Sequence, residues 1–144
     1  MTGRLGKAFK ARVLRLADDA GGVAAEFAVL LPVFLLIIVG IVELSHYGFT
    51  QMTLADAARS GARYASTHGS TSPVPATSST VTTTVRNAAV NLNPALISVN
   101  ATFVPNNAPG SVAAVVVTYP FTPILSGVIP AITVTVSSRM VIVY

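Results

Sequence analysis

The sequence of 144 residues contains no cysteine and no tryptophan, and only 10% of its residues are charged. Without cysteine the chain cannot form disulfides, cysteine-ligated zinc sites, iron–sulfur clusters or a thiol nucleophile. The charged fraction is far below the ~25% that is typical of soluble globular domains, which argues against an ordinary cytosolic protein. Hydrophobic residues make up 52%, which argues equally against a highly charged disordered chain.

Lysine is absent after residue 10, and positive charge is concentrated at the N-terminus. Five of the nine Lys and Arg residues fall within residues 1–15, whereas residues 16–144 hold four Arg and all five acids. A nucleic-acid-binding protein would spread cations over a folded surface, so nucleic acid is not a predicted partner. Apolar residues recur at helical spacing within this basic segment (Leu5, Phe9, Val13 and Leu16). They predict either an amphipathic helix on an anionic membrane surface or a frayed basic tail.

An uncharged apolar run occupies residues 27–42. As a helix it spans about 24 Å, and extension back to Gly21 gives about 33 Å, enough to cross a hydrocarbon core of ~30 Å. Because the cations precede the run, the positive-inside rule places the N-terminus in the cytoplasm and exports the C-terminal part. Pro32 lies inside the run and predicts a kink or a loosened turn.

Two alternatives to a membrane anchor are weaker. A buried core helix would need surroundings that the rest of the chain cannot supply, because the run is apolar on all sides. A cleavable secretory signal would need a small-residue cleavage site close to the run. The nearest A-x-A pattern, residues 55–57, begins thirteen residues beyond Val42 and lies in a segment with helical periodicity.

Glu26 is the one carboxylate at the start of the apolar run. An ionisable residue at the end of a membrane helix is costly unless it is paired, and is by default a candidate functional residue. The alternative is that Glu26 lies at headgroup depth, where the helix N-terminus favours an anion. Gly21 and Gly22 lie between the basic leader and Glu26. This context favours the interpretation that Glu26 is a functional residue that pairs with a cation.

The segment around Glu26 resembles the site that prepilin peptidases cut, with a Gly before the cut and Glu at the fifth mature position. Three stretches extend the likeness, namely GVAAEFAVLLPVFLLIIVGIVEL (22–44), AARSGARYAS (57–66) and VVVTYPFTPIL (115–125). Together they resemble the TadE-like family of Tad/Flp (tight adherence) pilus assembly proteins. The resemblance implies cleavage between Gly21 and Gly22, and assembly through Glu26, Phe27 and Pro32.

Past the membrane, helical periodicity continues to residue 65. A stripe with many small residues predicts close packing on one face (Leu44, Tyr47, Gln51, Leu54, Ala55, Ala58, Ala62 and Ala65). Asp56 can pair with Arg59 at i, i+3. Arg59 and Arg63 are either a solvated face near the helix end or a contact with an acidic partner subunit.

The C-terminal half predicts a small exported head. A Ser/Thr/Pro-rich linker (66–79) precedes a short amphipathic helix near 80–92, with Ser78 or Ser79 as its cap. Three strands follow, near 97–103, 112–119 and 132–142, and are expected to form an antiparallel sheet with one face covered by helix. The fold class is therefore α+β and pilin-like, with a leader (1–21), a transmembrane helix and stalk (22–65), the linker and a head (80–144).

The function implied by the resemblance is that of a minor pilin or pseudopilin in assembly of a Tad/Flp-type type IV pilus. Its expected partners are other pilin and pseudopilin subunits, a prepilin peptidase, the pilus assembly platform and the membrane. We expect no catalytic residue, cofactor or metal, since the head contains no acid and the two histidines, His46 and His68, have no ligand-like spacing. The alternative is an uncleaved single-pass membrane-anchored binding or adhesion module.

Overall fold

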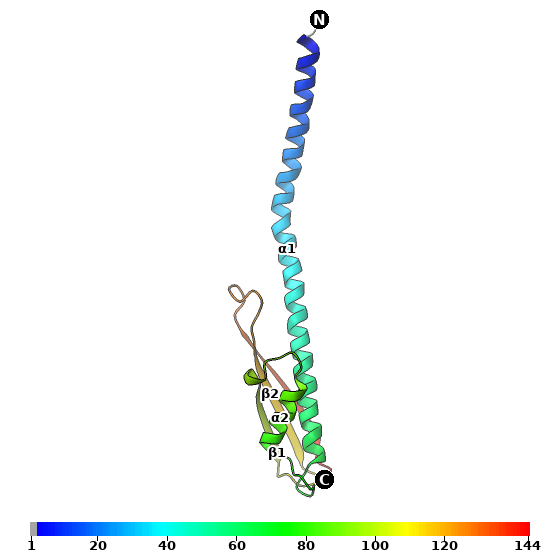
Figure 1. Ribbon diagram of the computed structural model, residues 1–144, viewed down its shortest axis with the longest axis vertical. Coiled ribbons are helices and arrows are strands. Elements are labelled where there is room, and N and C mark those ends of the chain that lie inside the picture. The colour runs from blue at the N-terminus through cyan, green and yellow to red at the C-terminus, as the bar shows by residue number, and fades with distance from the viewer. Residues whose placement is uncertain (1–2) are drawn as a thin grey trace. The chain divides into compact units, whose positions relative to one another are not determined.

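A computed structural model describes the backbone of residues 3–144 and the side chains of residues 21–144. The elements are α1 (Gly3–Thr67), α2 (Ser78–Ala88), a 3₁₀ turn (Pro94–Leu96), β1 (Ser98–Val104), β2 (Val112–Phe121) and β3 (Ile132–Val141). The chain divides into two compact units, Met1–Val42 and Glu43–Tyr144, and α1 contributes to both. This arrangement confirms the predicted α+β class (Figure 1).

Unit 1 is the N-terminal part of α1. The helix covers the predicted leader and continues through Pro32, so the backbone is helical rather than frayed from residue 3 onward. The side chains that would make the leader amphipathic lie outside the described residues. From Gly21 onward, α1 contains a window of mean hydropathy 2.8 with none of its residues buried, so it is long and apolar enough to cross a membrane.

Unit 2 is built on a three-stranded antiparallel sheet of order β1-β2-β3. The register pairs Ala101 with Val115 in one ladder and Val117 with Val136 in the other. Because side chains alternate along a strand, one face of the sheet presents the buried Val115, Val117 and Val134 to the helices. Strand β2 is longer than the predicted 112–119, because it continues through Pro120 to Phe121, which lies opposite Ile132.

The core of unit 2 lies between this face of the sheet, α1 and α2. From α1 it takes one large side chain, Leu54, and four fully buried alanines (Ala57, Ala58, Ala62 and Ala65). The predicted stripe is therefore correct in this part of the helix. The predicted stripe is wrong at Leu44 and Gln51, which are exposed. The residues one position earlier, Glu43 and Thr50, are buried in their place.

Helix α2 lies against β1 and is fixed by its ends. Its N-cap is Thr77 rather than Ser78 or Ser79, because Thr77 and Thr80 form a reciprocal capping box. The helix ends at Ala88, and Val81 and Val85 bury the apolar face that its sequence period predicts. Near its C-terminus, Arg86 donates from Nε and Nη2 to the carbonyl of Ile97 at 3.4 and 3.1 Å.

Candidate functional site

The predicted cleavage and assembly residues all lie on unit 1. Gly21 and Gly22 are consecutive residues inside α1, and a Cβ at either position would meet no atom within 4 Å. Phe27 is 63% exposed, and Pro32 is held within the continuous helix. The peptide bond between the two glycines is therefore helical, and nothing among the described residues covers it.

Glu26 lies on the same exposed helical surface. Its side chain shares a shallow hollow with Ala25, Val29 and Leu30, so its near neighbours are apolar. Among the residues that the structure describes, the carboxylate of Glu26 forms no hydrogen bond or ion pair. Residues four apart on a helix are neighbours, so the backbone nitrogen of Gly22 belongs to the turn directly preceding this carboxylate.

The second carboxylate of the helix, Glu43, has a different environment. It is buried, and its Oε1 and Oε2 accept from the backbone N–H of Ile124 at 3.2 and 3.0 Å. The ring of Phe121 packs nearby against the rings of His46 and Tyr47, at centroid distances of 4.9 and 5.4 Å. Glu43 thus connects the β2–β3 loop to α1 through hydrogen bonds. No local pattern in the sequence reveals this contact, because the partner is 81 residues away.

Arg59 and Arg63 lie on the outer face of α1 in unit 2. Arg59 Nη1 donates to Asp56 Oδ1 at 3.1 Å, with both side chains about two-thirds or more exposed, which confirms the predicted pair. Exposed pairs of this kind add little stability. The guanidinium of Arg63 makes no contact of this kind within the described part of the chain. The apolar Phe49 and Met52 are exposed on the same stretch of helix.

The small residues between the two arginines face inward and permit close packing. Gly61 and Ala62 are buried, and a Cβ on Gly61 would overlap the side chain of Val85 on α2. The A-R-x-G-A-R pattern of residues 58–63 therefore separates into a buried side of Ala and Gly and an exposed side of Arg and Ser.

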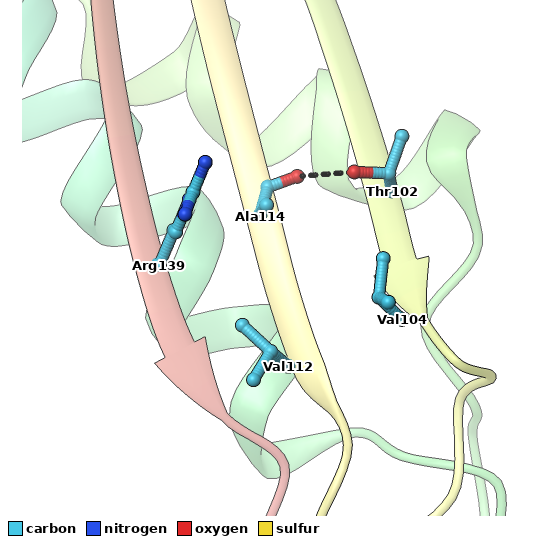
Figure 2. A pocket seen from close by; sticks show the side chains of 5 residues that line it. All are labelled: Thr102, Val104, Val112, Ala114 and Arg139. Atoms are coloured by element: carbon cyan, nitrogen blue, oxygen red, sulfur yellow. Dashed lines mark hydrogen bonds between the residues drawn. The ribbon is translucent and has the colours of Figure 1, made fainter.

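The outer face of the sheet carries a shallow hollow, shown in Figure 2. It is lined by Thr102, Val104, Val112, Ala114 and Arg139, and Thr102 Oγ1 donates to the carbonyl of Ala114 at 3.4 Å. Arg139 supplies its only charge. No three His, Cys, Asp or Glu side chains gather into a metal-binding group in the region whose side chains are described.

Comparison with known proteins matches only the N-terminal helix. The model of the family described as TadE-like protein matches residues 21–63. No curated protein and no solved structure matches the chain. The matched segment contains the apolar run, both glutamates of the helix and both arginines of the stalk, whereas the head lies outside it. Across residues 21–63, this chain is similar to the TadE-like family.

Proposed function

We propose that this chain is a minor pilin-like subunit that takes part in assembly of a Tad/Flp-type type IV pilus and packs through its N-terminal helix. The observation that carries the proposal is the exposed carboxylate of Glu26 among apolar neighbours on a TadE-like helix. An unpaired carboxylate in an apolar setting is unfavourable until a cation neutralises it. A neighbouring subunit that supplies this cation would make assembly depend on the correct register of the helices.

A prepilin peptidase would supply the cation by cleaving after Gly21. Cleavage creates an α-amino group on Gly22, one helical turn from Glu26 of the same chain or of a neighbour. It also removes five cations with Asp18 and Asp19. The family match begins at residue 21, which supports this boundary between leader and mature chain.

The membrane orientation follows from the charge distribution. The leader would remain in the cytoplasm, α1 would cross the inner membrane once, and the head would be exported. The length and hydropathy of α1 support a single crossing. After assembly the head would lie outside the cell within the pilus.

Lateral partners of the stalk are the other pilin and pseudopilin subunits. The outer face of α1 in unit 2 presents the apolar Phe49 and Met52 and the guanidinium of Arg63. Apolar contact area and a cation further along the same helix suit an acidic partner, since a desolvated charge pair fixes the register of the two subunits. We assign Arg59 and Arg63 to this contact, with the assembly platform as a further partner during insertion into the filament. We propose no catalytic activity.

The experiment has two measurements on protein from cells with an active prepilin peptidase. Intact mass should show Gly22 as the first residue, whereas an uncut chain would refute cleavage. Pulldown of partner pilins should fall for Glu26→Gln, which keeps the size of the side chain and removes its charge. Asp56→Asn makes the same change at an exposed pair and, because it leaves Arg59 and Arg63 in place, should not lower pulldown. Equal recovery of partners by both variants would contradict the pairing role of Glu26.

An uncleaved, membrane-anchored binding or adhesion module is the second candidate. It is favoured by the helical geometry of the Gly21–Gly22 bond, which a peptidase would have to unwind, and by the hollow on the outer sheet face. The same mass measurement separates the two, because this candidate requires the leader to be retained.

A further inference from the structure

The loop between β2 and β3 exposes apolar side chains and contains no charge. Residues 122–131 include the exposed Ile124 and Val128, and Val128, at 81%, is the most exposed large hydrophobic side chain of the described residues. Single exposed apolar residues are ordinary, but a continuous uncharged patch marks a contact surface. In Figure 1 this loop lies at the end of the sheet opposite the C-terminus.

Two contacts determine the direction in which the loop extends. Phe121 packs against His46 and Tyr47, and three residues later the N–H of Ile124 donates to Glu43. The chain therefore advances by about one helical turn toward the N-terminus of α1 between these two points. In the sequence, Glu43 directly follows the uncharged apolar run, residues 27–42.

Glu43 marks the expected outer boundary of the bilayer. The segment 22–42 rises about 31 Å as a helix, which matches a hydrocarbon core of about 30 Å. Glu43 is the first charged residue after that segment. The backbone of Ile124 is hydrogen-bonded to this carboxylate, so the start of the exposed loop lies at the same depth. This step rests on the membrane anchoring in the proposed function.

We propose that the loop 122–131 is a second membrane contact, in which Ile124 and Val128 enter the interfacial zone of the lipid bilayer where α1 leaves it. The occupant is a lipid surface because the loop offers apolar area and no charged side chain, which is what interfacial binding uses. Part of its backbone is already satisfied, since the N–H groups of Val128 and Ile129 both donate to the carbonyl of Leu125 at 2.9 Å. Satisfied backbone groups lower the cost of leaving water.

The absence of cysteine makes the proposal directly testable in the full chain. Val128→Cys, labelled with the fluorophore NBD and reconstituted in phosphatidylethanolamine–phosphatidylglycerol vesicles, reports contact with a lipid that carries a nitroxide at a shallow acyl position. Ser137→Cys, on the outer sheet face opposite Val116, is the matched control in the head. Leu30→Cys, inside the apolar run, is the reference for the membrane span and is read with a lipid that carries its nitroxide deep in the acyl chain, because residue 30 lies near the middle of the segment 22–42.

We expect the nitroxide lipid to quench the label at 128 several-fold more strongly than the label at 137, at every protein-to-lipid ratio. Quenching at 30 with none at 128 would overturn the loop contact and leave the membrane anchor standing. No quenching at 30 would overturn the anchor and the loop contact together. Shielding at 128 that vanishes on dilution in lipid would overturn the lipid assignment in favour of contact between copies of the chain.

Glu43→Ala tests how the loop is held. It removes both acceptors of the Ile124 N–H, so we expect quenching at 128 to fall while quenching at 30 is unchanged. Far-ultraviolet circular dichroism would show that the head remains folded. Undiminished quenching at 128 in the folded variant would overturn the positioning role of Glu43.

Discussion

Gly61 offers the most direct test of how the stalk packs against the head. A Cβ at this position would overlap the side chain of Val85 on α2 and would also lie 3.4 and 3.5 Å from methyl carbons of Val81 and Val115. Val85 is fully buried, and a β-branched side chain in a helix has one strongly preferred rotamer. It cannot move aside cheaply, so Gly61→Ala must displace α2 or strain the contact.

Two opposing effects set the magnitude. Replacing glycine with alanine inside a helix gains about 0.5–1 kcal/mol, whereas overpacking a core costs about 1–3 kcal/mol. Gly48→Ala is the matched control, because Gly48 lies in the same helix and a Cβ there meets nothing within 4 Å. Gly48→Ala gains the helix propensity of alanine without the overpacking. The free energies of unfolding of the two variants should therefore differ by about 1–3 kcal/mol.

Urea unfolding of the full chain in mild detergent, followed by near-ultraviolet circular dichroism of the tyrosines, measures this difference. With an m-value of about 2 kcal/mol/M, the two midpoints should be separated by about 0.5–1.5 M, with Gly61→Ala the less stable. Adding Val85→Ala to Gly61→Ala should recover part of the loss beyond additivity, since the two positions touch. Coincident midpoints for Gly61→Ala and Gly48→Ala would refute the packing of α1 on α2.

Three further substitutions test other parts of the fold and its surface. Leu54→Ala should lower the free energy of unfolding by about 2–5 kcal/mol because its side chain is fully buried, while Met52→Ala, at an exposed position two residues away, should change it little. Thr77→Ala should cost about 0.5–2 kcal/mol through loss of the capping box; equal unfolding midpoints for Thr77→Ala and Thr83→Ala would contradict that role. Arg63→Glu should reduce pulldown of partner pilins without altering the unfolding midpoint, and unchanged pulldown would count against the arginine contact.

Local patterns in the sequence predicted the elements of this fold well. The alternation of apolar and polar residues placed β3 and its inward face, and Val81 and Val85 set the buried face of α2. The boundaries of α2 were less accurate. The N-cap is Thr77, one residue before Ser78. A capping box needs a second polar side chain three residues after the cap, and Thr80 supplies its hydroxyl.

Long-range contacts were the part that the sequence could not reveal. Leu44 fitted a hydrophobic stripe better than its acidic neighbour, yet the structure buries Glu43 and exposes Leu44. Burial of a carboxylate is unfavourable unless hydrogen bonds compensate it. Here the compensation comes from the backbone of Ile124, which is separated by 81 residues. The helical repeat of 3.6 residues, on which the predicted stripe was based, cannot identify that donor.

The two glutamates of α1 show why a shared helix can serve two purposes. They are seventeen residues apart in the sequence, and their environments are opposite. Glu43 has both oxygens engaged by the head and is therefore used within its own chain. Glu26 has no such bond within the described residues and lies among apolar side chains. Its carboxylate is therefore available to the α-amino group that cleavage would create or to a cation of a neighbouring subunit, which is why assembly would depend on Glu26 and not on Glu43.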